Sequence, residues 1–173
     1  LRSLKRRGPD ASGIRMFDCA LLFHTRLAVV DIENGTQPME AEYGGERYTI
    51  VYNGELYNTE EVRRELAALG ETFTGHSDTE VVLKAYIRWK KDCLSRFNGI
   101  FAFAVWEKKE HRLFFARDRM GVKPFFYSFR NGTFVFGSEI KALLEYPGVE
   151  PVIDRNGIAE LLFVGPGRTP GYG

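Results

Sequence analysis

The sequence contains little cysteine, and this limits the kinds of site that it can build. Cys19 and Cys93 are the only two cysteines among 173 residues, and they stand far apart without metal-ligand spacing. Neither a disulfide framework nor a metal site is therefore predicted. Each thiol is predicted to be a small buried hydrophobic group rather than a reactive one. A reducing cytoplasm is the expected location.

Long apolar runs and an excess of one charge are also missing. The densest apolar stretch, residues 100–106, is much shorter than the roughly 18 residues that a membrane-spanning helix needs. Lys and Arg number 24 against 23 Asp and Glu, and the longest basic run is residues 5–7. Neither a membrane nor a nucleic acid is therefore predicted as a partner. A small molecule or another protein is favoured instead.

The sequence is rich in apolar and β-branched stretches bounded by turn residues, which are typical of short strands. Strands are predicted at residues 14–17, 20–25 with a continuation through 27–30, 47–52, 101–106, 112–116, 124–128 and 133–136. Helices are predicted to begin at capping residues, namely Asn58, Ser77, Ser138 and Asp154. Because stretch 101–106 is apolar on both faces, both faces have to be covered. The pattern predicts an α+β fold with helices outside stacked antiparallel sheets.

Polar residues in four short stretches, 7–10, 24–31, 52–58 and 75–80, are harder to explain by structure alone. Arg26 stands in an apolar strand, so its charge has to reach solvent, a buried carboxylate or a ligand. Asn53 and Gly54 follow a strand, and they can form either a hairpin turn or a pair of donors for an oxyanion. Asp78 at a helix start can favour the helix dipole or bind an ammonium group.

Taken in order, these stretches resemble a known family: the glutaminase domain of glutamine-hydrolysing asparagine synthetases, a class II glutamine amidotransferase domain with an N-terminal nucleophile. The matching blocks are RRGPDASG at 6–13, RLAVVD at 26–31 with Gln37-Pro38 after it, YNGELYN at 52–58, HSDTEV at 76–81, FNGIFAFAVWE at 97–107, ARDRMGVKPFFY at 116–127 and GSEIKALLE at 137–145. They cover nearly the whole chain. The resemblance implies a four-layer αββα sandwich of antiparallel sheets, of the N-terminal-nucleophile hydrolase type.

The resemblance also implies a reaction. In this family an N-terminal cysteine thiolate attacks the side-chain amide of glutamine, ammonia leaves, and water then releases glutamate. By motif position, Asn53 and the Gly54 N–H are expected to form the oxyanion hole. Arg26 is expected to bind the α-carboxylate of the substrate through its guanidinium group.

Four further residues are expected to surround the rest of the glutamine molecule. Asp78 and Glu55 are expected near its ammonium and amide groups, and the backbone of Val29 and Val30 is expected to line the pocket. No cofactor is expected for this domain. The family sends ammonia to a C-terminal synthetase domain of the same protein, which uses ATP and magnesium to convert aspartate to asparagine. A homodimer is compatible with the resemblance.

The sequence departs from the family at its first residue, which is Leu1 rather than cysteine. Neither Cys19 nor Cys93 stands at the matching position. One expectation is that residues 1–173 are an amidotransferase domain that lacks its N-terminal strand and nucleophile and is cut before a synthetase domain, so that this chain alone is inactive. The alternatives are a nucleophile-less scaffold domain, as in β-lactam synthetases, and a module that senses glutamine without hydrolysing it. The residues upstream of Leu1 would separate these interpretations.

Overall fold

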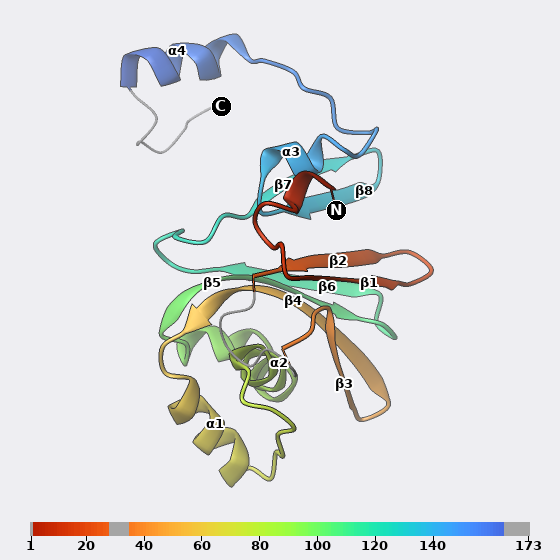
Figure 1. The fold of residues 1–173 in the computed structure, drawn as a ribbon, viewed down its shortest axis with the longest axis vertical. Helices are drawn as coiled ribbons and strands as arrows, with labels where there is room; N and C mark the ends of the chain where they lie inside the picture. The colour runs from red at the N-terminus through yellow and green to blue at the C-terminus, as the bar shows by residue number, and fades with distance from the viewer. Residues whose placement is uncertain (1, 28–34, 165–173) are drawn as a thin grey trace.

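The computed structural model describes residues 2–27 and 35–164, which are arranged in layers (Figure 1). A helical layer covers one face of a four-stranded sheet, and a second β layer made of two strand pairs covers the other face. A short helix lies outside the second β layer, so the order of the layers is αββα. The fold class predicted from the sequence is confirmed.

The central sheet is antiparallel, with strands in the order β3–β4–β5–β6. Its strands are β3 (Met39–Tyr43), β4 (Glu46–Leu56), β5 (Gly99–Glu107) and β6 (Arg112–Arg117). From residue 101 onward β5 is buried on both faces, as the apolar pattern predicts. Along β4 the side chains alternate, with Ile50 and Tyr52 toward the helices and Val51 toward the second β layer.

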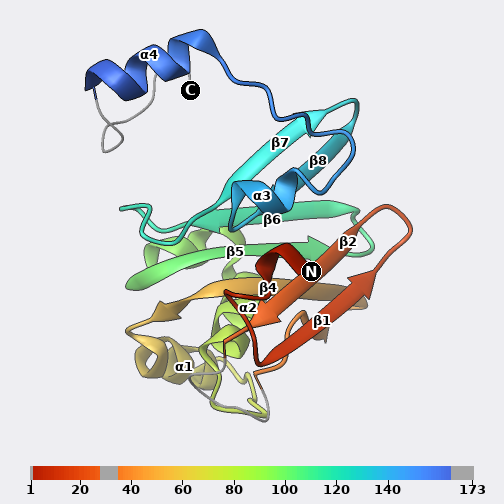
Figure 2. The ribbon, with the colours of Figure 1, turned by 45° about the horizontal axis from the view of Figure 1, so that its top comes forward.

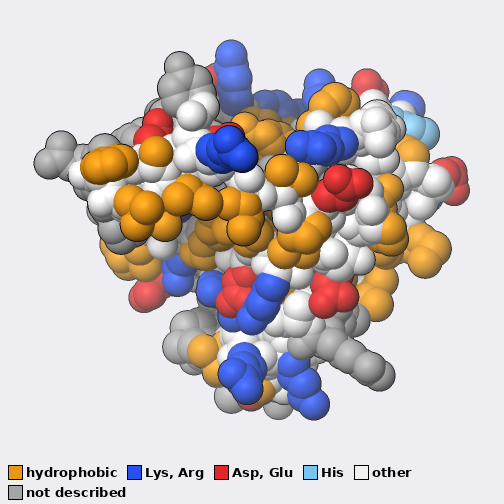
Figure 3. Space-filling view, turned by 90° about the horizontal axis from the view of Figure 1, so that it is seen from above, with side chains coloured by type: hydrophobic (Ala, Val, Ile, Leu, Met, Phe, Trp, Pro, Cys, Tyr) orange, Lys and Arg blue, Asp and Glu red, His pale blue; other side chains and the backbone are white. Residues whose placement is uncertain are grey.

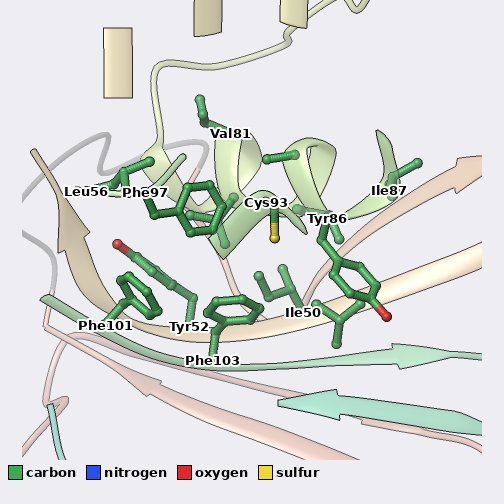
Figure 4. Close-up of a cluster of buried hydrophobic side chains, with 14 of the residues drawn as sticks. Ile50, Tyr52, Leu56, Val81, Tyr86, Ile87, Cys93, Phe97, Phe101 and Phe103 are labelled. Carbon is green, nitrogen blue, oxygen red and sulfur yellow. The ribbon is translucent and has the colours of Figure 1, made fainter. Parts of the chain in front are cut away.

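The helical layer consists of α1 (Thr59–Ala68) and α2 (Asp78–Trp89), and α2 continues into the 3₁₀ helix η2 (Lys90–Ser95). The Ser77 side chain caps α2 by accepting a hydrogen bond of 3.2 Å from the Thr79 N–H, as predicted. The helices and the central sheet enclose the main core (Figure 4), which includes Ile50, Tyr52, Leu56, Val81, Tyr86, Cys93, Phe101 and Phe103.

The second β layer is built from two separate strand pairs, β1 (Ala11–Met16) with β2 (Leu21–Arg26), and β7 (Phe126–Arg130) with β8 (Thr133–Gly137). Both pairs lie on the same side of the central sheet (Figure 2). Leu22 of β2 and Phe136 of β8 contact the same small cluster as Val51 and Trp106. Within residues 2–27 and 35–164, no ladder joins the two pairs.

The remaining helices are η1 (Arg2–Leu4), α3 (Ile140–Leu143) and α4 (Arg155–Val164). Asp154 caps α4 as predicted, because its Oδ2 accepts a hydrogen bond of 2.8 Å from the Gly157 N–H. Seen from above, apolar side chains form an exposed band on this face of the molecule (Figure 3). Leu161, Leu162 and Phe163 of α4 are all exposed. In the part of the chain that the structure describes, no helix is long and apolar enough to cross a membrane.

Some predicted boundaries are wrong. The sequence pattern ends the third predicted strand at Tyr52, but β4 continues to Leu56 because Asn53 and Gly54 pair with β5. Strand β3 is not predicted, although its five residues alternate between apolar and acidic side chains as an edge strand does. Helix α3 is preceded by Glu139 rather than by Ser138. Strand β2 ends at Arg26, and residues 28–30 of its predicted continuation lie outside the described residues.

Candidate functional site

The far end of β4 has an open edge, and this edge organises the candidate site. Strand β3 pairs with β4 only as far as Ile50, so within residues 2–27 and 35–164 no strand covers the edge beyond it. Tyr52 on this edge donates its N–H to Gln37 Oε1 at 2.6 Å, and its carbonyl accepts from Gln37 Nε2 at 3.0 Å. Along a β-strand, the backbone N–H groups of every second residue point to the same edge of the strand. The Gly54 N–H therefore points outward at this edge, between the bonded N–H groups of Tyr52 and Leu56.

Asn53 brings a second donor next to the Gly54 N–H. Its side chain lies on the opposite face of β4 from Tyr52, which is the face that the second β layer covers. The Nδ2 atom is buried and has no hydrogen-bond partner among the described residues. Leaving a buried donor without an acceptor costs about 1–3 kcal/mol. Asn53 and Gly54 thus present two adjacent N–H donors, which suits the binding of an anionic oxygen.

Gly54 is required for the packing of β4 on β5. A Cβ atom at this position would lie 2.6 Å from the Ile100 carbonyl oxygen and 2.8 Å from the Phe101 Cβ. Because both neighbours belong to the adjacent strand, they could not move aside without opening the sheet.

Asp78 closes the other end of the open edge. Its Oδ2 accepts hydrogen bonds from the Tyr52 hydroxyl at 2.9 Å and from the Leu56 N–H at 3.3 Å. Burial raises the pKa of the Asp78 carboxyl, although these hydrogen bonds oppose the rise. Burial and the neighbouring Asp78 also raise the pKa of Tyr52, so its hydroxyl keeps its proton and remains a donor. A partly desolvated carboxylate held in this way is suited to receive a cation such as an ammonium group.

Arg26 approaches the site from the second β layer. It is the last residue of β2 and is only 9% exposed. His24, two residues earlier, contacts the Tyr52 carbonyl oxygen through Nε2 at 3.1 Å. Because a carbonyl oxygen can only accept, Nε2 must carry the hydrogen. Burial, together with the nearby Arg26 charge, lowers the pKa of His24 and favours its neutral form. His24 therefore ties the strand that carries Arg26 to the strand that carries Asn53.

Gly8 fixes the position of the Arg26 backbone from the outer side. A Cβ atom at Gly8 would lie 2.2 Å from the Thr25 carbonyl carbon and 2.4 Å from the Arg26 nitrogen. The Asp10 N–H donates to the Arg26 carbonyl oxygen at 3.0 Å. The stretch at 7–10 is therefore more than a turn, because it packs directly on the end of β2.

The remaining residues predicted for the site are Glu55, Val29 and Val30. Glu55 is exposed and lies on the same face of β4 as Asn53. Val29 and Val30 lie outside the described residues. The sequence interpretation gave no role to Gln37 or Tyr52, which hold the open edge and Asp78 in place. The Gln37-Pro38 pair after the RLAVVD block was the available signal for Gln37, whereas Tyr52 looks like an ordinary strand residue.

The two cysteines do not reach this site. Cys93 is buried in the core, and burial raises the pKa of its thiol to about 12. Cys19 is exposed in the turn between β1 and β2, so the prediction that it is buried is wrong. This turn is at the opposite end of β2 from Arg26, roughly 17 Å away for five strand residues at ~3.3 Å each. Neither thiol can attack a substrate that is bound at the open edge of β4.

Comparison with known proteins identifies relatives over almost the whole chain. Residues 1–171 match the family model described as a glutamine amidotransferase domain. The chain is 56% identical over 171 residues to asparagine synthetase [glutamine-hydrolyzing] 3 of Bacillus subtilis, covering 99% of this chain and 28% of that protein. It is 44% identical over 138 residues to asparagine synthetase [glutamine-hydrolyzing] 1 of the same organism, covering 80% of this chain and 22% of that protein. The chain thus spans about a quarter of the length of these relatives.

The fold is shared with a solved amidotransferase. The glutamine phosphoribosylpyrophosphate amidotransferase of B. subtilis, solved in complex with ADP and GMP, superimposes with a TM-score of 0.70 at 23% identity. The superposition covers 82% of this chain and 38% of that one. At this identity the likeness concerns the fold. Together with the family match over residues 1–171, it shows that the chain belongs to the glutamine amidotransferase domain family.

Proposed function

We propose that this chain is the glutamine-hydrolysing domain of an asparagine synthetase, and that Asn53 and Gly54 stabilise the oxyanion of its reaction. The observation that carries the proposal is the buried Asn53 Nδ2, which has no partner in the described chain and lies next to the outward Gly54 N–H. The sequence similarity to glutamine-hydrolysing asparagine synthetases supports the choice of substrate.

Glutamine would be held by opposite charges at its two α substituents. Arg26 would bind the α-carboxylate, since a guanidinium group can donate two parallel hydrogen bonds to it. Asp78 would accept from the α-ammonium. We propose that Glu55 and the backbone of Val29 and Val30, of which the two valines lie outside the described residues, also line the pocket. The Tyr52 hydroxyl and the Leu56 N–H both donate to Asp78 Oδ2, and they would keep this carboxylate oriented before the ammonium group binds.

The reaction itself places charge on the amide oxygen of the substrate. When a thiolate attacks the amide carbon, the carbonyl oxygen becomes anionic, and the donors of Asn53 and Gly54 meet charge that the ground state does not carry. The attacking thiolate comes from a residue other than Cys19 and Cys93, because neither reaches the open edge. Collapse of the intermediate releases ammonia, and water then releases glutamate.

The released ammonia would be consumed by a synthetase domain of the same protein. We propose that this domain converts aspartate to asparagine in the cytoplasm, using ATP and magnesium. Because the chain spans about a quarter of its relatives, the synthetase activity would lie in the rest of the protein. No step assigned to residues of this chain depends on ATP or magnesium.

The test is the Asn53→Ala variant of the intact protein. Loss of one oxyanion donor typically lowers kcat by about 10²–10³-fold, and KM for glutamine should change little. Glutamate release at varied glutamine concentration gives both constants. Asn58→Ala is the matched control, since the Asn58 side chain instead bonds the Arg96 carbonyl at 2.9 Å and the Asn98 N–H at 2.9 Å. We expect this control to melt at a lower temperature while its kcat stays near that of the parent.

A steep rise in KM with unchanged kcat in Asn53→Ala would show that Asn53 binds the ground state, and the oxyanion assignment would fail. If the intact parent protein bound glutamine but released no glutamate, the domain would be a sensor rather than an enzyme.

A further inference from the structure

A cysteine and a histidine face each other at a place remote from the glutamine site. Cys19 lies in the turn between β1 and β2, and His111 lies in the turn between β5 and β6. The Cys19 Sγ is 3.5 Å from His111 Nδ1. Both residues line a small hollow of about 30 Å³, whose other walls are Phe17, Asp18, Trp106 and Lys108. The hollow has room for about one water molecule or one atom group of similar size.

Trp106 points independently to a ligand at this hollow. The residue is only 6% exposed, and its Nε1 has no hydrogen-bond partner among the described residues. Its ring lies near the rings of Phe17 and His111, at centroid distances of 6.0 and 6.1 Å. An indole N–H that is buried without an acceptor is uncommon, because it has lost its hydrogen bond to water. An acceptor atom attached at Cys19 could restore this bond.

The Cys19–His111 pair has the chemistry of an activated thiol. A thiolate is far more nucleophilic than a thiol, and a neighbouring imidazole promotes ionisation by taking the proton. The backbone N–H of Phe17 donates to the Ala20 carbonyl at 2.8 Å, which closes the turn around Cys19 and leaves the thiol exposed. Cys93 is the opposite case, since burial raises the pKa of its thiol to about 12 and denies access to reagents.

We propose that Cys19 is a modification site that forms a mixed disulfide with small disulfides, with His111 as the proton acceptor. The thiol proton moves to His111 Nδ1, and the Cys19 thiolate bonds to one sulfur of the disulfide. The disulfide bond breaks, and the second sulfur leaves with the electron pair as a thiolate, which takes up a proton. Cys19 is thereby oxidised and the leaving thiol is reduced. The Trp106 N–H donates to an acceptor atom of the attached group.

The test measures thiol–disulfide exchange on the intact protein with 5,5′-dithiobis(2-nitrobenzoate). The Cys19 and Cys93 peptides are quantified by mass spectrometry after brief exposure at pH 6 to 9, so that other thiols do not interfere. At pH 6 to 7 we expect Cys19 to react about tenfold faster than the cysteine of an unstructured peptide of the same turn sequence. The thiol of the free peptide ionises by itself at a pKa of about 8.5, so the two rates are compared below that pH. Cys93 should stay unmodified in the folded protein.

His111→Asn is the decisive variant, because asparagine tolerates the positive φ of 49° at this position but cannot take the proton. We expect its Cys19 rate to fall to that of the peptide. A second readout uses Trp89→Phe, which leaves Trp106 as the tryptophan of this domain. Its fluorescence should change on modification of Cys19 and recover with dithiothreitol. The proposal would be overturned if Cys19 in the parent protein reacted no faster than the peptide cysteine. It would also be overturned if His111→Asn left the Cys19 rate unchanged, or if Trp106 fluorescence did not change on modification of Cys19.

Discussion

At the scale of single residues, Asp78 is a site residue whose burial lowers the stability of the folded protein. Its carboxylate is partly buried, and burial raises its pKa above the ordinary value of 3.8. The unfolded chain then loses this proton at lower pH than the folded chain does. Between the two pKa values the folded state binds more protons, so stability falls as pH rises through that window. Above that window the folded protein carries the full penalty, which a bound ammonium group would relieve.

Asp78→Asn should therefore separate binding from stability. Asparagine keeps an oxygen that can accept from the Tyr52 hydroxyl and the Leu56 N–H, but it carries no charge to desolvate. We expect a melting temperature at pH 7 equal to or above that of the parent, with the gain vanishing below about pH 4. Glutamine affinity should fall by about 2–5 kcal/mol, since the ammonium loses its partner.

Thermal melts from pH 3.5 to 7.5 and glutamine titrations on a nucleophile-inactivated protein would measure both effects. Asp92→Asn, at an exposed residue, serves as a control that should change neither quantity. If Asp78→Asn melted several degrees lower and still bound glutamine like the parent, Asp78 would have to be reassigned to a structural role.

At the scale of elements, the junction between the Gly8 segment and β2 controls where Arg26 stands. In Gly8→Ala the new methyl group would meet the backbone of Thr25 and Arg26 at 2.2–2.4 Å, so one of the two segments has to shift. Overpacking of this kind costs about 1–3 kcal/mol or more. We expect Gly8→Ala to lower both the melting temperature and glutamine affinity.

The control for this variant is Gly44→Ala in the β3–β4 turn. Gly44 has φ of 59° and nothing within 4 Å of a built Cβ, so alanine meets backbone strain alone. That strain costs about 1–2 kcal/mol, and glutamine affinity should not change. Calorimetric titration and thermal melts on the two variants give the comparison. Equal losses of stability with parental affinity in both would mean that Gly8 does not position Arg26.

The elements themselves were largely predictable from the sequence, and the exceptions have physical reasons. Period-two alternation and capping residues located most strands and the start of α2. The end of β4 was missed because Asn53-Gly54 is a strong turn signal, whereas here Gly54 serves the close approach to Ile100 and the strand continues. Local turn chemistry could not reveal this, since the deciding contact comes from a strand that is distant in sequence.

The sequence predicted residues for the candidate site, but not the hydrogen bonds that hold them in position. The motifs singled out Arg26, Asn53 and Asp78, and the structure brings Asn53 and Asp78 to one stretch of β4. The links between these residues run through Gln37, Tyr52 and His24, whose hydrogen bonds span 15 to 28 positions in sequence. Such long-range bonds leave no periodic signal, so the sequence pattern could not show them.

At the scale of the whole molecule, the arrangement of the two cysteines predicts how the 173 residues behave by themselves. Cys93 is sealed in the core, and Cys19 is at the far end of β2 from Arg26. We therefore expect a chain of these residues alone to release glutamate from glutamine only at background rate. A coupled glutamate assay would measure it. Turnover that disappeared in Cys19→Ser or Cys93→Ser would refute the placement of the nucleophile.

The open edge of β4 also bears on the addition of strands from other molecules. An uncovered strand edge is a template on which another chain can add a strand. Here the Gln37 amide occupies both backbone groups of Tyr52, and the Asp78 carboxylate occupies the Leu56 N–H. A foreign strand would have to displace both, and it would also have to bury the Asp78 charge. Among the described residues, these two side chains therefore oppose strand addition at this edge, and they leave the Gly54 N–H between them for a small polar molecule.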